Sequence, residues 1–450
     1  MASKSLDMTK GNLWKQIFVF SLPLMLSNFL QVLFNLSDII VVGQFGKKNS
    51  IGAVGSTSIL ISLFTGIMIG MGNAVNVVVA KAIGQKNEEK IHITIHNGIL
   101  LCFIIGLLFG ILGISLSYPL LSILGTKEEV FSDAQLYFCV YLIGMPGVAL
   151  YNYGNAIYSA LGDTKRPLIY LAIAGALNIG LNMFFVAVCQ LDVLGVALAS
   201  SISQYLSMSL ILISLFRRND EFKLKFKEIK PNKQDTLELL KIGVPASLQN
   251  AIFAIANLFI QGSVNTFDIV MVNGNSAASN YDALVYDVMA AFYYAGSSFI
   301  GQNFGAGKKK RILHTYFISV VYSLGVGLII GLFLELGGRP ALALFTTDEA
   351  TISAGMQRLR IMGYSYFVSA LMDSAIAASR GLGKTFLPMV LEIFGVCVFR
   401  IVWVYTIFAY FHTIESLYLL YLGSWILSAV MEIPCFIYYY KKLTKDMVNE

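Results

Sequence analysis

Long apolar stretches, separated by short polar segments, run along the whole chain. About twelve of them approach or exceed the roughly 20 residues that an α-helix needs to cross a bilayer. Two of these stretches, 52–80 and 276–303, are rich in Gly, Ser and Asn, which is typical of helices that face a bundle interior or a cavity rather than lipid. The predicted spans cover residues 16–41, 52–80, 94–117, 134–160, 168–189, 194–216, 240–265, 276–303, 315–336, 357–379, 386–410 and 416–440.

The composition agrees with this pattern. Of the 450 residues, 56% are hydrophobic and 13% charged, against about 45–50% and about 25% in soluble domains. The net charge is +6, but the basic residues are bunched between apolar stretches, which indicates membrane topology rather than nucleic-acid binding. The sequence therefore predicts an all-α integral membrane protein that binds no nucleic acid.

Basic residues in the short loops predict the orientation of the spans, because cytoplasmic loops are enriched in Lys and Arg. They follow every even-numbered span, whereas the odd-numbered loops hold few, with Lys47 and Lys48 as the exception. We therefore expect a multi-pass protein of the inner (plasma) membrane with both termini in the cytoplasm. The basic residues after the even spans include Lys81, Lys86, Lys90, Lys165, Arg166, Arg218, Lys223, Lys308, Lys309, Arg380, Lys384, Lys441 and Lys442.

The longest polar stretch divides the chain into two similar halves. We expect an N-terminal six-helix lobe over 1–216, a cytoplasmic linker over 217–239 and a C-terminal six-helix lobe over 240–450. Six spans separate the repeated motifs, so the two bundles are predicted to be parallel and pseudo-symmetric around a central cleft, as in alternating-access transporters. The motif pairs are SLPLMLSNFLQ at Pro23 with GVPASLQNAIF at Pro245, AKAIGQKNEEKI at Gly84 with SFIGQNFGAGKKKRI at Gly301, and SALGDTKRPL at Gly162 with SRGLGKTFLPM at Gly383.

Asp38 lies within the first predicted span, in VLFNLSDIIVVG. A charge at the bilayer centre costs at least about 2.5–3.5 kcal/mol on insertion scales, so an acid there is a candidate functional residue. Such a carboxyl group can exchange a proton or pair with a cation. Asn35 lies three residues earlier, on the same helix face. The alternative is a structural Asp that is satisfied by neighbouring Asn and Ser side chains.

Polar residues in the fifth and sixth spans could complete a cation site with Asp38. Asn178 and Asn182 are four residues apart, on one helix face, and Ser200 is followed one turn later by Gln204. Amide and hydroxyl oxygens beside one carboxylate would suit a hard cation such as Na⁺. The alternative is that these side chains only hold neighbouring helices together.

The second half carries four charged candidates within predicted spans: Asp282, Asp287, Asp373 and Arg400. Asp282 and Asp287 are five residues apart, so they cannot both face one site. Asp373 and Arg400, on neighbouring helices, could form a buried ion pair with a structural, gating or substrate role. Aromatic faces can bind organic cations, and the candidates for cleft lining are Tyr281, Tyr286, Phe292 and Tyr293.

Several motifs of other functions are incomplete. GAGKKKR and GLGKT depart from GxxxxGK[ST] and follow apolar helices rather than strands, so an ATP-driven pump is not expected. His92 and His96 are spaced i, i+4 without an acid in HExxH register, so no metal site is predicted there. No GxSxG or Cys/His constellation is present. We therefore expect no enzyme activity and no cofactor.

At the repeated motifs the chain resembles the multidrug and toxic compound extrusion (MATE) transporters. The resemblance covers essentially the whole chain, and its main segments are 21–46, 84–91, 242–265, 299–312, 380–389 and 399–408. It implies twelve helices in two six-helix lobes and export of cationic or amphipathic organic compounds against Na⁺ or H⁺. The family's N-lobe cation-site Asp falls at Asp38, and Asn178 matches its Asn. Asn182 stands in place of a second acid and Ser200 in place of a Thr, which removes one negative charge.

The resemblance and the residues together predict a monomeric, ion-coupled multidrug exporter in the lipid bilayer. Its metal ligands would be Asp38, Asn178, Asn182 and Ser200, if Na⁺ rather than H⁺ is the coupling ion. One alternative is a flippase for lipids or lipid-linked oligosaccharides, which should need a basic cavity for phosphates; Arg400 is the main residue in its favour. A receptor without transport is the other alternative, and the duplication and Asp38 argue against it.

Overall fold

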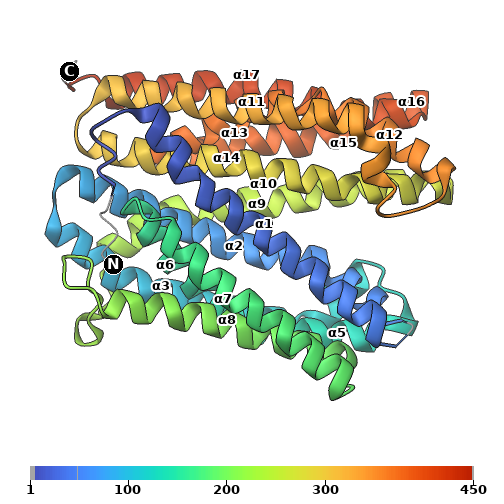
Figure 1. Ribbon diagram of the computed structural model, residues 1–450. Helices are drawn as coiled ribbons and strands as arrows, with labels where there is room; N and C mark the ends of the chain where they lie inside the picture. Colours follow the sequence, from blue (N-terminus) through green and yellow to red (C-terminus); the bar gives the residue numbers. More distant parts are fainter. Residues whose placement is uncertain (1–5, 48, 448–450) are drawn as a thin grey trace. The chain divides into compact units, whose positions relative to one another are not determined.

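The computed structural model describes residues 6–47 and 49–447, apart from the side chains of Asn35 and Leu258. Regular structure in this part of the chain is entirely helical (Figure 1). The elements are α1 (Leu13–Phe45), α2 (Ser50–Gln85), α3 (Glu88–Ser115), α4 (Ser117–Ile123), α5 (Glu128–Ile143), α6 (Met145–Ala160), α7 (Lys165–Asn182), η1 (Met183–Val188), α8 (Asp192–Phe216), η2 (Phe226–Glu228), α9 (Lys233–Val264), α10 (Ile269–Gly305), α11 (Lys309–Leu342), α12 (Glu349–Gly363), α13 (Tyr366–Gly381), α14 (Phe386–Glu392), η3 (Ile393–Val398), α15 (Phe399–Trp403), η4 (Val404–Phe408), α16 (Ala409–Phe411) and α17 (Ile414–Leu443).

These helices confirm the predicted membrane spans. In the described part, ten helices are long and apolar enough to cross a bilayer, and counting each of two bent helix pairs as one span gives twelve. The bent pairs are α5 with α6, at 45°, and α12 with α13, at 49°. The first bend lies at Gly144, and Pro146, two residues later, has no N–H with which to continue the helical ladder. Hydropathy predicted a single span at each pair, 134–160 and 357–379, because it does not register such a break.

The chain divides into two compact units. Unit 1 comprises Met1–Asp7 and Leu26–Ala251, and unit 2 comprises Met8–Met25 and Ile252–Glu450. Helices α1 and α9 therefore each run from one unit into the other. These boundaries differ from those of the predicted lobes, because the first turns of α1 group with the second half of the chain and the first turns of α9 with the first half.

Side-chain packing explains both crossings. In unit 2, the Tyr322 hydroxyl donates to the Trp14 carbonyl at 3.2 Å, and the Phe20 ring meets the Phe299 ring edge-on at 5.5 Å. In unit 1, Ser247 Oγ donates to the Ile67 carbonyl at 2.8 Å. A Cβ on Gly70 would lie 2.5 Å from the Ser247 backbone nitrogen, so only glycine permits α2 and α9 to approach this closely.

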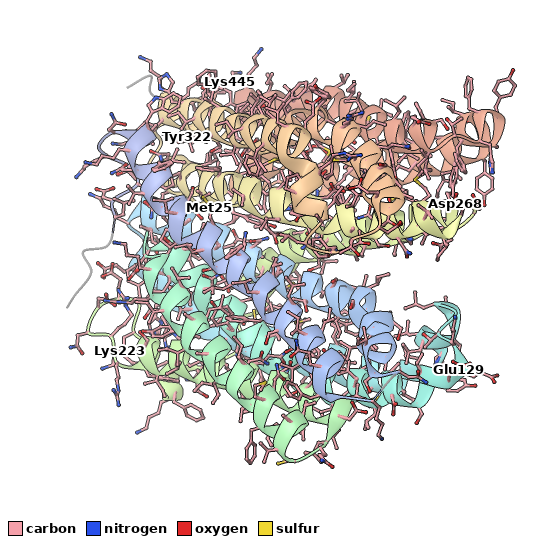
Figure 2. All side chains as sticks on the ribbon, turned by 45° about the vertical axis from the view of Figure 1, so that its right-hand side comes forward. Met25, Glu129, Lys223, Asp268, Tyr322 and Lys445 are labelled. Atoms are coloured by element: carbon pink, nitrogen blue, oxygen red, sulfur yellow. The ribbon has the colours of Figure 1, made fainter. Side chains whose placement is uncertain are left out.

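Each unit is a bundle of long helices with an apolar core. In unit 1, α2 packs against α3, α5 and α6, and α7 packs against α8; in unit 2, α10 packs against α11, α12 and α13, and α17 packs against α13. Charged loops lie at the ends of these helices. Lys223 and Glu129 mark opposite ends of unit 1, and Lys445 and Asp268 mark opposite ends of unit 2 (Figure 2).

Candidate functional site

Asp38 is buried in unit 1, where three helices meet. Its side chain belongs to α1 and is 5% exposed. Asn182 at the end of α7 donates through Nδ2 to Asp38 Oδ1 at 2.5 Å, and Ser200 on α8 donates through Oγ to Asp38 Oδ2 at 3.0 Å. The structure therefore brings together residues that lie far apart in the sequence.

Asn178 completes a ring of four buried polar side chains. Its Oδ1 accepts from Asn182 Nδ2 at 3.2 Å, and its Nδ2 donates to Ser200 Oγ at 3.4 Å. The exposed fractions of Asn178, Asn182 and Ser200 are 5%, 0% and 6%. Within the described residues, Asn182 Oδ1 accepts no hydrogen bond, and no Lys or Arg forms an ion pair with Asp38. The ring thus holds one carboxylate and one free amide oxygen; we call it the Asp38 ring.

Local features of α7 place this ring. Asn178 and Asn182 are one turn apart and face the same side. A π-helical segment, η1, begins at Met183, directly after Asn182, and π-helical turns within α-helices are frequently found at functional sites. A Cβ on Gly175 would overlap the Phe34 ring. The missing side chain at Gly175 therefore lets the Phe34 ring of α1 pack on α7, one turn before Asp38.

We expect Gly175→Ala to displace the Phe34 ring and to destabilise the protein by about 1–3 kcal/mol, the usual cost of overpacking. Gly180→Ala on the same helix is the matched control, since a Cβ added there would meet no atom within 4 Å; it should be neutral or stabilising by about 0.5–1 kcal/mol. Thermal unfolding of the two variants in detergent compares these effects. Equal shifts in Tm would contradict the role of Gly175 in placing α1.

Two further candidates were predicted near the Asp38 ring: Asn35 as a cation-site residue and Gln204 as a substrate or gating residue. The side chain of Asn35 lies outside the described residues, so its position relative to Asp38 stays a prediction. Gln204 lies one turn beyond Ser200 on α8, but it packs against Gly144 instead, where a Cβ would overlap Gln204 Oε1. Gln204 therefore fills the bend between α5 and α6.

Asp282 forms a buried ion pair in unit 2 that the sequence did not predict. Arg358 on α12 approaches Asp282 Oδ2 with Nε at 2.7 Å and with Nη2 at 2.6 Å. Arg358 Nη1 donates to Asn275 Oδ1 at 2.8 Å, and the Tyr366 hydroxyl donates to Asp282 Oδ1. Arg358 lies next to the start of the predicted span 357–379, where a charge is typical of a loop. Asp287, five residues beyond Asp282, is half-buried and takes no part in this ion pair.

The hypothesised ion pair between Asp373 and Arg400 is wrong. Arg400 is 1% exposed, and its partners are neutral: Nε donates to Ser424 Oγ at 3.1 Å and Nη1 to Asn257 Oδ1 at 3.1 Å. Its guanidinium carbon lies 4.7 Å from the centre of the Tyr421 ring. An amide, a hydroxyl and an aromatic face therefore surround this cation where a carboxylate was expected.

Two of the tyrosines predicted to line a cleft pack against other helices of unit 2. The Tyr281 hydroxyl donates to the Ala341 carbonyl at 2.7 Å. The Tyr286 ring packs edge-on against Tyr366 at 6.1 Å and Trp425 at 5.8 Å, between centroids. Tyr293 lies beside the neighbouring Tyr294, at 4.9 Å. These contacts assign Tyr281 and Tyr286 to the packing of unit 2, and their role in substrate binding stays a prediction.

The Asp38 ring has no second carboxylate at the repeated position. The MatE family model matches residues 23–184 and 245–406, two segments offset by 222 residues. The residue 222 positions after Asp38 is Ile260, which is buried in the apolar core of unit 2. The two halves therefore align with each other over these segments, but only the first half has a carboxylate at this position.

Known proteins similar to this chain span most of its length. YpnP of Bacillus subtilis, named a probable multidrug resistance protein, is 27% identical over 81% of each chain. NorM of Thermotoga maritima, with the same description, is 25% identical over 92% of this chain and 88% of its own. A crystal structure of MATE in complex with MaL6 superposes with a TM-score of 0.91 at 22% identity, covering 99% of this chain and 100% of the other.

Proposed function

The chain belongs to the MATE family of multidrug efflux transporters, and from this premise we propose that it is a secondary active exporter of cationic or amphipathic organic compounds, driven by exchange for Na⁺ or H⁺. It is a multi-pass membrane protein. We propose that it acts as a monomer in the plasma membrane. Both termini are expected in the cytoplasm, because the loops after its even-numbered spans are basic.

The geometry of the Asp38 ring carries this proposal. A buried carboxylate that no described Lys or Arg pairs with is costly in a membrane, and it needs either a proton or a cation when the ring is isolated from water. Protonation would make the Asp38 carboxyl a hydrogen-bond donor. Alternatively, the Asn182 amide could turn its free Oδ1 toward Asp38, and Na⁺ would then bind between oxygens of Asp38, Asn182 and Ser200. Protonation of Asp38 and binding of Na⁺ would therefore both take place within the Asp38 ring.

The charge of the ring also bears on the flippase alternative. A carboxylate, two amides and a hydroxyl suit a cation, whereas a phosphate headgroup would be bound by Arg or Lys. Arg400 is the contrary residue, but it already donates to Ser424 and Asn257. We therefore assign the Asp38 ring to the coupling cation, and substrate binding to residues outside it.

Ethidium efflux from proteoliposomes under separately imposed ion gradients tests the proposed coupling. We expect one inward gradient, Na⁺ at equal pH or H⁺ at equal Na⁺, to accelerate ethidium release from the vesicles, and the gradient's collapse by an ionophore to abolish it. Vesicles without protein give the background. Release that responds to neither gradient would contradict ion-coupled export.

A further inference from the structure

Two histidines and a glutamate from separate elements meet where the linker contacts α3. His92 and His96 lie one turn apart on α3, with ring centroids 4.1 Å apart and ring planes inclined by 33°. Glu228 ends the short helix η2 in the linker, 136 residues after His92 in sequence. On α3 itself no acid stands in HExxH register with the histidines, and the fold supplies one from the linker instead.

The ligand atoms of these three residues form a compact group. His92 Nε2, His96 Nε2 and Glu228 Oε2 all lie within 4.8 Å of one another. His92 Nε2 contacts Glu228 Oε2 directly, and the distance from His96 Nε2 to the same oxygen is 3.9 Å. Ligands that each stand about 2.0–2.2 Å from one Zn²⁺ ion are spaced similarly, so small side-chain shifts suffice to close the site.

The tautomer of His96 is suited to metal binding. Its Nδ1 donates to the His92 carbonyl oxygen at 2.8 Å, so the lone pair is on Nε2, the nitrogen that lies 3.9 Å from Glu228 Oε2. Metal-bound histidines usually donate their second ring N–H to a carbonyl or a carboxylate in this way. The backbone N–H of Lys225 donates to His96 Nε2 at 3.0 Å, and a metal would have to displace this amide.

One oxygen of the Glu228 carboxylate faces the histidines and the other faces Lys225. Lys225 Nζ donates to Glu228 Oε1 at 3.0 Å, while Oε2 faces the imidazoles. Hydrogen bonds from Lys225, and then from His92, hold the pKa of Glu228 below its usual value. The positive charge of Lys225 opposes a cation, but the side chains of His92 and Glu228 are 40% and 38% exposed, so water can complete the coordination.

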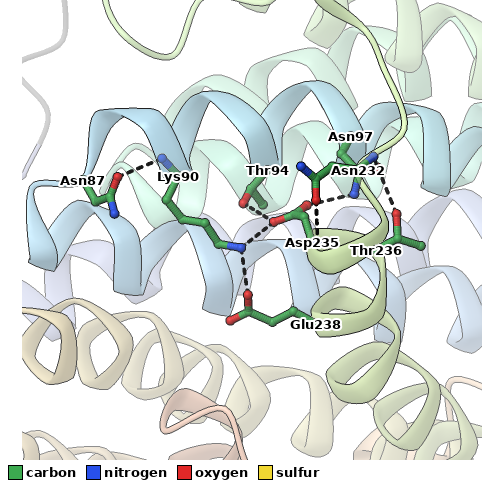
Figure 3. Close-up of polar contacts among 8 residues, drawn as sticks. All are labelled: Asn87, Lys90, Thr94, Asn97, Asn232, Asp235, Thr236 and Glu238. Carbon is green, nitrogen blue, oxygen red and sulfur yellow. Dashed lines mark hydrogen bonds and ion pairs between the residues drawn. The ribbon is translucent and has the colours of Figure 1, made fainter.

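A neighbouring network fixes the linker to α3. Asp235, at the start of α9, is 1% exposed. It accepts from Lys90 Nζ and Thr94 Oγ1, each at 2.7 Å, and from Asn97 Nδ2 at 2.8 Å (Figure 3). The backbone N–H of Asn232 donates to Asn97 Oδ1 at 3.0 Å. These hydrogen bonds hold the C-terminal end of the linker against α3. Glu228 therefore loses little conformational entropy when it contacts the histidines.

We propose that His92, His96 and Glu228 form a site for a divalent transition metal of the Zn²⁺ class, which clamps the linker onto α3. Two imidazoles and one carboxylate suit Zn²⁺, Cu²⁺ or Ni²⁺ rather than Mg²⁺ or Ca²⁺. Three protein ligands leave a coordination position for water. The site is formed by residues distinct from the Asp38 ring and is independent of the transported compound.

Calorimetric titration of the full-length, tag-free protein with Zn²⁺ in detergent tests the site. We expect one Zn²⁺ per chain, with affinity reduced at least about tenfold by His92→Gln or Glu228→Gln, because even groups that only hydrogen-bond to a metal ligand change metal affinity about 10–100-fold. The matched controls are His412→Gln and Cys189→Ser, which alter an exposed imidazole and an exposed thiol elsewhere. These two variants should bind Zn²⁺ like the parent protein.

Limited trypsin digestion provides a second measurement that does not depend on heats of binding. Trypsin cleaves after Lys225 and Lys227, which precede Glu228 in the linker. Bound Zn²⁺ should therefore slow cleavage of the linker in the parent protein and in the controls. It should not slow cleavage in His92→Gln or Glu228→Gln. The proposal is overturned if Zn²⁺ fails to bind up to about 1 mM, or if the ligand variants and the controls bind and digest alike.

Discussion

Replacing Asp38 by Asn is expected to reduce drug export to the background of protein-free vesicles, under either a Na⁺ or a pH gradient. The substitution keeps the size of the side chain and its place between Asn182 and Ser200, but it removes the charge and the titratable proton. A coupling ion would then find four neutral side chains in the ring. The measurement is ethidium efflux from vesicles that contain equal amounts of inserted protein.

Thermal unfolding separates this effect from misfolding. An amide at position 38 removes an isolated buried charge, whose cost in a membrane is at least about 2.5–3.5 kcal/mol. Asp38→Asn should therefore unfold at the same Tm as the parent or at a higher one. Asp38→Glu is the conservative control: it retains the carboxylate and should keep part of the response to the driving ion. Normal efflux by a well-folded Asp38→Asn protein would refute the coupling role.

Arg358→Ala should cause the largest loss of stability among the substitutions considered. It would leave the Asp282 carboxylate buried with the Tyr366 hydroxyl but without its cation. Breaking a buried ion pair from one side costs about 3–5 kcal/mol, so we expect a strongly lowered Tm in detergent and poor recovery of monodisperse protein.

Two comparisons identify the buried charge as the cause. Arg339→Ala removes a second Arg–acid pair of unit 2, in which the side chains of Arg339 and Glu349 are 58% and 76% exposed; such pairs contribute about 0–1 kcal/mol. Arg358→Met combined with Asp282→Leu removes both buried charges and should recover most of the lost stability. If the double variant is as unstable as Arg358→Ala, the packing of the arginine stem is responsible instead.

Hydropathy predicted the spans well because a bilayer imposes both length and apolar character on each helix. It did not predict the bends at Gly144 and after Gly363, because neither break interrupts the apolar stretch. Helix periodicity likewise placed Asn178 and Asn182 on one face. The resemblance to the family supplied the link from these residues to Asp38, which periodicity within one helix cannot provide.

Pairs of residues that are distant in sequence were the hardest to predict. Arg358 and Asp282 are 76 residues apart, and Glu228 and His92 are 136 apart. Their pairing depends on which helix faces which, and on where the linker folds back. Arg358 lies at a span boundary and Glu228 in a loop, where a charge is ordinary. Arg400 shows the converse case: a buried arginine was expected to require an acid, and the fold surrounds it with neutral acceptors and rings.

In the proposed exchange, the isoleucine at the repeat position of Asp38 would leave the duplicated site with a single carboxylate. With Asp38 in the first half and Ile260 at the equivalent position, this site would carry one charge per cycle instead of two. One-for-one exchange of Na⁺ or H⁺ for a monovalent drug cation is electroneutral, so the membrane voltage, worth about 2.3 kcal/mol per charge per 100 mV, would neither drive nor oppose it. The concentration gradient of the ion, at about 1.4 kcal/mol per tenfold, would then set the steepest drug gradient that the protein can sustain.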